Sequence, residues 1–148
     1  MTEADFSYTG ERFADIQLLR YRLNGFEQLS LSQKQYIYCL AKATLYGRDI
    51  TFDQFGRYNL IIRKTLEAIV SDLTLDERDN GEFDKLIVYL KRVWFSNGIY
   101  HHYGCEKFKP EFSEPFFRNI LNKVDSRRLP LESGETVEAL ADKLVRIM

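Results

Sequence analysis

The sequence has few cysteines and no long apolar run, the features that characterise disulfide-rich and membrane-spanning proteins. Its 148 residues include two cysteines, Cys39 and Cys105, which lie on different segments and form no C-x-x-C pair. This usage favours a reducing compartment or incidental thiols over a disulfide framework, although a single bridge remains open. No apolar run approaches the roughly 18 residues that a membrane span requires, so we expect no membrane partner.

The amino terminus also lacks the features of a targeting segment. The first five residues are acidic, and no apolar region follows them, so they do not resemble a secretory signal. A cytoplasmic location is therefore the default expectation. A leader upstream of the first residue remains open.

Neither sign of charge dominates the chain. Its 21 Lys and Arg nearly cancel its 22 Asp and Glu, so no global field favours nucleic acid. Tyr89, Lys91, Arg92 and Trp94 have the composition of a base-stacking surface, but a helix with one wet and one buried face has the same composition. The phosphate loops G-x-G-x-x-G and G-x-x-x-x-G-K-[ST] are absent. We expect no nucleic-acid partner and no nucleotide chemistry.

Apolar residues are plentiful and recur at helical spacing. They make up 45% of the chain, which is enough for the core of one domain over residues 1–148. Positions three and four apart predict helices in six segments, at residues 11–23, 31–46, 59–73, 82–97, 114–124 and 137–148. We expect a mainly α fold, an irregular bundle of about five to six helices with long ordered loops.

Capping residues mark several helix ends. Ser30 and Gln33 have the spacing of a capping box, and Gly47 is placed to end the same helix with a positive φ. Asp79 and Glu82 resemble a second capping pair.

Two further signals lie outside that set. The connector 47–56 mixes turn formers with aromatic anchors and is predicted to be an ordered loop, with a short strand left open. Ser113, followed by Pro115 in the first turn, predicts the start of the fifth segment.

Residues 94–108 hold both histidines and are the most unusual stretch. His101, His102 and Cys105 are residue types that bind zinc, but adjacent histidines tend to point in different directions, and no second ligand pair lies elsewhere. Cys105 with His102 as base would form a nucleophilic pair, but the sequence shows no orienting group and no oxyanion site. The zinc-peptidase motif H-E-x-x-H is absent. We expect no catalytic and no metal-ligating residue in this chain.

The same stretch fits either a binding surface or a structural cap. Gly98 and Gly104 allow close backbone approach, and Tyr100, Tyr103 and Phe108 provide flat faces. Such a loop suits a groove for a peptide or small ligand. Rings that seal the end of a bundle have the same composition, and composition alone favours that structural interpretation.

Three separated blocks are more distinctive than any single motif. They are residues 12–21 (RFADIQLLRY), residues 47–54 (GRDITFDQ), and residues 89–99 (YLKRVWFSNGI) followed by HHYG at 101–104. In this order they closely resemble the amino-terminal region of bacterial dipeptidyl peptidase III, from about Tyr8 to the final helix. The family's pattern often has histidine at position 100, where this chain has Tyr100, and this departure weakens a metal-binding role for the cluster.

The family comprises two-lobed zinc metallopeptidases, hydrolases that remove dipeptides from the amino terminus of short peptides. The resemblance implies that this chain is a fragment of the lobe that faces the zinc domain across the substrate cleft. The family's H-E-x-x-x-H motif and downstream glutamate ligand have no counterpart here. Zinc is therefore expected in the parent enzyme only, and the chain alone is expected to be inactive. By resemblance the segment after the third main helix lies toward the cleft, with Asn97, Tyr103 and Phe108 as substrate-binding candidates.

The resemblance implies two partners, the remainder of the parent enzyme and short peptide substrates. A fragment that exposes apolar surface would also favour a homodimer. The alternative is a stand-alone, non-catalytic peptide-binding or scaffolding domain. A third hypothesis, an independent hydrolase that uses Cys105, predicts activity that alkylation abolishes.

Overall fold

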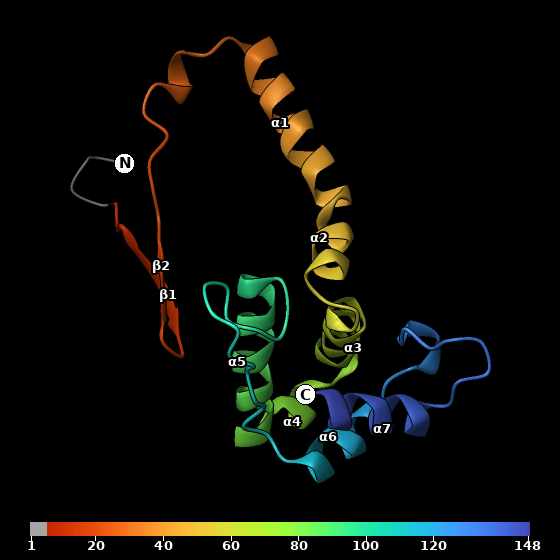
Figure 1. Ribbon diagram of the computed structural model, residues 1–148. Coiled ribbons are helices and arrows are strands. Elements are labelled where there is room, and N and C mark those ends of the chain that lie inside the picture. Colours follow the sequence, from red (N-terminus) through yellow and green to blue (C-terminus); the bar gives the residue numbers. More distant parts are fainter. Residues whose placement is uncertain (1–5) are drawn as a thin grey trace. The chain divides into compact units, whose positions relative to one another are not determined.

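The computed structural model describes residues 6–148 (Figure 1), and the chain divides between Arg48 and Asp49 into two compact units. Residues 1–5, the segment that does not resemble a secretory signal, lie outside the described residues. The described chain is mainly α-helical, as the sequence predicts, with a single two-stranded sheet within residues 6–148. None of its helices is both long and apolar enough to cross a membrane.

The first unit begins with a β-hairpin where the sequence predicts a helix. Strands β1 (Thr9–Phe13) and β2 (Ile16–Leu19) pair antiparallel around a turn in which Ala14 has φ 48°. The prediction of a helix over residues 11–23 is therefore wrong. Phe13 and Ile16 lie three residues apart, and this spacing suits partners across a two-residue turn as well as neighbours on one helical face. The Gln17 side chain also donates a hydrogen bond to the carbonyl of Gly10, 3.0 Å away.

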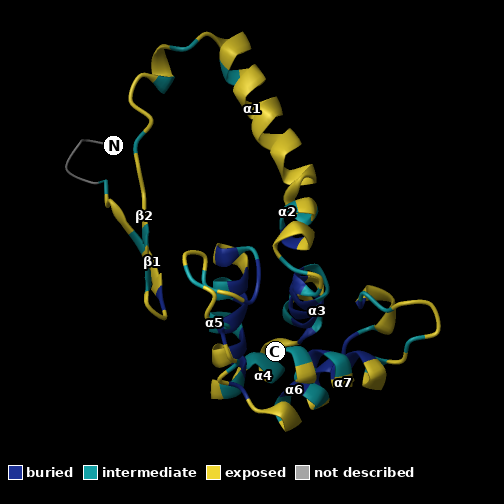
Figure 2. Cartoon of the chain, viewed as in Figure 1, coloured by how far each residue is buried: buried dark blue, intermediate teal, exposed yellow. Residues whose placement is uncertain are grey.

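Helix α1 (Leu31–Tyr46) follows the short 3₁₀ helix η2 (Phe26–Gln28). The predicted capping box is confirmed, because Gln33 N donates to Ser30 Oγ at 3.3 Å and Ser30 N donates to Gln33 Oε1 at 2.8 Å. No residue of α1 is buried, and the predicted apolar stripe lies exposed (Figure 2).

The end of α1 differs from the sequence-based expectation. Gly47 has φ −82°, so the chain keeps right-handed geometry, and helix α2 (Arg48–Phe55) begins at the next residue. The predictions of a positive φ at Gly47 and of a loop over 47–56 are both wrong. Phe52 of α2 is almost fully buried, which explains how a segment rich in turn formers is held as a helix.

The core of the second unit lies among four helices. These are α3 (Asn59–Asp72), α5 (Gly81–Ser96), α6 (Glu114–Leu121) and α7 (Val137–Ile147). Helix α3 packs on α5 and α6 packs on α7. The side chains that lie at 1% exposure or less share these inner faces: Ile62, Leu66, Ile69, Leu86, Leu90, Val93, Phe117, Leu121, Leu140 and Leu144. Each comes from the periodic apolar pattern of its segment. These four predicted helices are therefore confirmed, and with α1 five of the six predicted helices are present.

The helix starts in the second unit are set by polar side chains. Helix α4 (Leu75–Arg78) is a single turn with its own capping box of Thr74 and Glu77. Asn80 caps α5, because its Oδ1 accepts from Phe83 N at 2.9 Å, so the predicted pair of Asp79 and Glu82 is wrong.

The later helix starts follow their predictions. The Ser113 hydroxyl accepts from Phe116 N at 3.4 Å, with Pro115 in the first turn, as predicted. The 3₁₀ helix η3 (Ser126–Arg128) follows α6, and Thr136 caps α7.

Candidate functional site

The stretch singled out in the sequence forms a short hairpin directly after α5 (Figure 1). Tyr100 and Lys107 face each other in an antiparallel bridge. His101 N donates to Glu106 O and Phe108 N donates to Ile99 O, each at 2.8 Å. We call residues 99–108 the 99–108 hairpin. Its polar and aromatic side chains are thereby held on a defined backbone rather than on a free loop.

A buried asparagine fixes the base of this hairpin. Asn59, at the start of α3, is 2% exposed; its Oδ1 accepts from Ile99 N at 3.2 Å and its Nδ2 donates to Asn97 O at 3.5 Å. A Cβ added at Gly98 would lie 2.2 Å from the Nδ2 atom, so only glycine fits there. Asn97 reverses the chain at the end of α5 with φ 55°. Sequence reasoning missed Asn59, although its place in the apolar period of α3 was the available signal.

The three predicted substrate-binding residues lie in different environments. Asn97 is partly buried and turns its carbonyl toward Asn59. Phe108 is 7% exposed, with the Arg92 guanidinium 5.0 Å from its ring centroid. Tyr103 is 92% exposed at the tip. His101 lies between the last two, with ring centroids 6.1 Å from Phe108 and 6.3 Å from Tyr103.

The two histidines stack instead of pointing apart. Their ring centroids are 4.5 Å apart, and His102 also packs on Tyr103 at 4.4 Å and edge-on against Phe95 at 4.9 Å. His101 Nδ1 accepts from Tyr103 N at 3.2 Å, which occupies one of its two nitrogens. This stacked set therefore acts as one aromatic surface.

The donor set does not fit zinc. Within residues 6–148 no group of three or more His, Cys, Asp or Glu is placed to hold a metal ion, and both Cys39 and Cys105 are exposed free thiols. Catalytic and structural zinc sites both need at least three protein ligands. No step that uses zinc can therefore be assigned to these residues.

An open depression of about 580 Å³ lies along one side of the hairpin. Its lining carries mostly positive charge and consists of Arg92, His101, Glu106, Lys107, Phe108 and Lys109. Of the three predicted residues it contains Phe108 alone.

A polar network ties α2, α3 and α5 together beneath this region. Arg63 is 4% exposed, donates through Nη2 to Asp49 Oδ1, and has its Nε 3.6 Å from Glu67 Oε1. Trp94 Nε1 donates to the same Glu67 oxygen at 2.7 Å. The hydrogen bond from Arg63, with a second from Lys64, holds the pKa of Asp49 below its usual value. Four side chains thus connect three helices through charge-assisted bonds.

Tyr89 of α5 is the other perturbed group nearby. Burial raises the pKa of its hydroxyl well above the ordinary value, and that hydroxyl has no hydrogen-bond partner among residues 6–148. Its ring packs edge-on against Phe112 at 5.7 Å, within the apolar core. A buried phenol that stays protonated fits a structural role.

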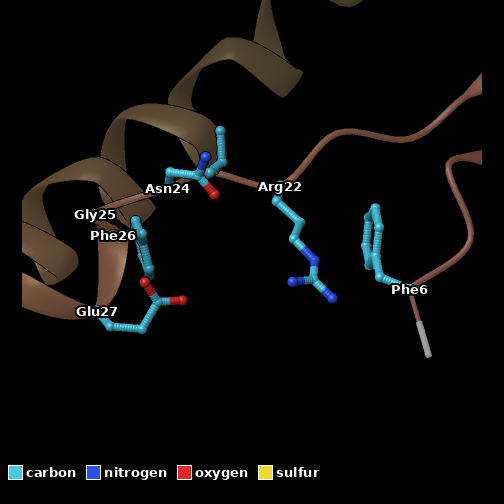
Figure 3. Close-up of a pocket in the computed structure, with 7 residues that line it drawn as sticks. Phe6, Arg22, Asn24, Gly25, Phe26 and Glu27 are labelled. Atoms are coloured by element: carbon cyan, nitrogen blue, oxygen red, sulfur yellow. The ribbon is translucent and has the colours of Figure 1, made fainter. Parts of the chain in front are cut away.

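The first unit has an open pocket of its own, of about 570 Å³ (Figure 3). The Arg22 guanidinium lies 4.6 Å from the ring centroid of Phe6, and Glu27 and Phe26 border the other side. A single carboxylate and a stacked guanidinium make no catalytic pair, so we assign no reaction to this pocket.

Comparison of the chain with protein-family models and with curated proteins gives no match.

Proposed function

We propose that this chain is a non-catalytic segment of a zinc-dependent dipeptidyl peptidase III, to which it contributes core structure and a peptide-facing surface on the 99–108 hairpin. The anchored hairpin is the observation that carries the proposal. Asn59 holds both the amide of Ile99 and the carbonyl of Asn97, so exposed aromatic side chains rest on a rigid base. Preorganised surfaces of this kind lose less entropy when they bind an extended ligand.

The interactions of the resembling blocks support the proposal. Asp49 belongs to the second block and Trp94 to the third, and the two are linked through Arg63 and Glu67 of α3. Asn97 and Gly98, also in the third block, are the residues that fit against Asn59. Residues of the resembling blocks thus make specific contacts that hold this fold together, as expected if the chain shares the fold of the family it resembles.

The exposed apolar surface of α1 supports a larger parent. Ile37, Leu40 and Leu45 are 42%, 48% and 59% exposed, and Tyr36 and Tyr46 are more exposed still. A helix that exposes this many large apolar side chains usually contacts other protein. In the proposal the remainder of the parent enzyme encloses it. The zinc ligands and the catalytic glutamate belong to that remainder.

The test is a steady-state assay of the full-length enzyme with a dipeptidyl arylamide. Tyr103→Ala removes an exposed ring without disturbing the core, so we expect KM to rise roughly tenfold while kcat changes little. Tyr103→Phe keeps the ring and is the matched control, with KM close to that of the unaltered enzyme. Equal KM values for all three proteins would overturn the assignment of this hairpin to the substrate surface.

The stand-alone alternative makes opposite predictions. An open reading frame that continues past Met148 into H-E-x-x-x-H supports the peptidase segment, whereas a stop codon at that point supports a separate binding domain. Light scattering of the purified chain adds a second measurement, because exposed apolar surface on α1 favours self-association.

A further inference from the structure

The strand of the 99–108 hairpin that contains Lys107 has an unpaired outer edge. The bridge between Tyr100 and Lys107 is made by the amides of His101 and Phe108, so the backbone N–H and C=O of Lys107 point away from the partner strand. Within residues 6–148, no hydrogen bond reaches the backbone of Lys107 or Lys109. The edge therefore offers donors and acceptors at alternate residues.

The side chains along this edge also alternate. Phe108 is buried at 7% exposure, and the lysines on either side of it lie toward the surface. Neither Lys107 nor Lys109 forms an ion pair within the described residues. In an extended strand, residues two apart lie on one face about 7 Å from each other. Two uncompensated ammonium groups thus accompany the open backbone edge, and both line the depression beside Arg92.

We propose that this edge, residues 107–109, binds an extended peptide segment that carries carboxylates at alternate positions. The peptide would add as a strand, with its backbone paired to Lys107 and Lys109 and with one acidic side chain opposite each lysine. Residues 111–112 bend toward the start of α6, which limits the site to a short stretch. This inference rests on the proposed peptide-facing role of the hairpin, to which it adds a substrate class and a register.

A structural explanation competes with this one. Lysines on edge strands discourage pairing between sheets, and that role requires no ligand. The two explanations differ in what an acidic strand should do. If the lysines only prevent pairing between sheets, the edge binds no peptide. If the proposal holds, the edge binds an acidic peptide and prefers carboxylates at alternate positions.

The experiment uses the ¹⁵N-labelled 148-residue chain and three end-capped hexapeptides of equal charge. One has glutamates at its third and fifth positions, one has them adjacent, and one repeats the first with N-methylated backbone amides on its pairing side. We expect the alternating peptide to shift the amide signals of Lys107 and Lys109 and to bind roughly fivefold more tightly than the adjacent one. The N-methylated peptide should lose binding, because it cannot pair with the edge.

Variants separate the site from general charge attraction. The double variant Lys107→Gln with Lys109→Gln should remove the preference for alternating glutamates. Lys42→Gln removes one charge from α1, where the side chain has no ion pair among the described residues, and should leave binding unchanged, whereas Lys107→Gln alone, which also removes one charge, should weaken it. Absence of binding, equal binding of the two spacings, or full binding of the N-methylated peptide would each overturn the proposal. None of these outcomes bears on the KM test of Tyr103, so the two proposals fail separately.

Discussion

Helices α1 and α5 have the same length, 16 residues each, and very different surroundings. Helix α5 buries Phe83, Leu86, Tyr89, Leu90, Val93 and Ser96, whereas α1 buries none of its residues. Both are capped by a polar side chain at the first turn. The difference lies in the distribution of apolar residues, which α5 gathers more strongly on one face than α1 does. Figure 2 shows α1 exposed along its length and α5 with a buried face. A cap and a run of helix-forming residues are enough to form a helix. To be buried within this chain, a helix also needs its apolar residues on one face.

Deleting a leucine from each helix should give the largest difference between them. Leu86 is fully buried, so Leu86→Ala should lower the free energy of unfolding by about 2–5 kcal/mol through lost apolar burial and a residual cavity. Leu40 is 48% exposed, so Leu40→Ala should cost under about 0.5 kcal/mol in the isolated chain.

Urea unfolding followed by two probes checks this pair. Fluorescence of Trp94, the one tryptophan of the sequence, reports on the second unit, and far-ultraviolet circular dichroism reports on all helices. Equal losses for the two variants would show that α1 is packed in solution as tightly as α5. That result would remove the contrast between the helices.

The second test concerns the ends of the two helices. Helix α1 ends at Gly47 with right-handed φ, and α2 begins at the next residue, whereas α5 ends at Asn97 with positive φ, and Asn59 holds the hairpin beyond it. Gly98→Ala places a methyl group against the Asn59 amide and should cost about 1–3 kcal/mol. Gly47→Ala should be nearly neutral or slightly stabilising, because Gly47 has φ −82° and an added Cβ would only make ordinary contact with Thr44 O at 3.6 Å.

A double-mutant cycle sharpens the result at Gly98. Asn59→Ala alone leaves the Ile99 amide without its acceptor, which should cost about 1–3 kcal/mol. In that background the clash partner is gone, so adding Gly98→Ala should cost much less than it does alone. Additive losses, measured by urea unfolding with Trp94 fluorescence, would mean that the two residues do not contact each other.

The parts of the fold that follow from sequence are those with a one-sided pattern. Ile62, Leu66 and Ile69 predict the buried face of α3, and the same logic holds for α5, α6 and α7. The hairpin at β1 and β2 was missed because Phe13 and Ile16 satisfy both a helical and a cross-strand spacing. Nothing local distinguishes the two, since the deciding turn at Ala14 contains neither Gly nor Asn.

The 99–108 hairpin falls within the segment that the sequence singles out, but its internal geometry does not follow from the sequence. The glycines and aromatic residues of 94–108 do mark a distinctive segment, yet the residue that positions it, Asn59, lies 40 positions from Ile99 in sequence. Stacking of His101 on His102 depends on the hairpin backbone, which no short-range pattern reveals. Long-range hydrogen bonds and side-chain stacking are set by the tertiary fold, so they cannot be predicted from the local patterns of a single sequence.

The smallest expected loss of stability comes from substitutions at the helix starts. These substitutions test whether α1 unfolds independently of the second unit. Asn80→Ala removes the acceptor of the Phe83 amide and should lower the stability of the second unit by about 1 kcal/mol, because α5 unfolds only with its core. Ser30→Ala breaks the capping box of α1 and should lower the local stability of that helix by a similar amount. Because α1 has no buried residue, this loss should not reach the core of the second unit. The Trp94 unfolding midpoint should therefore stay unchanged in Ser30→Ala while amide hydrogen exchange across α1 becomes faster. If Ser30→Ala shifts the Trp94 midpoint as far as Asn80→Ala does, then α1 is part of the same cooperative unit, and its exposed apolar surface must be covered in solution by a contact such as self-association.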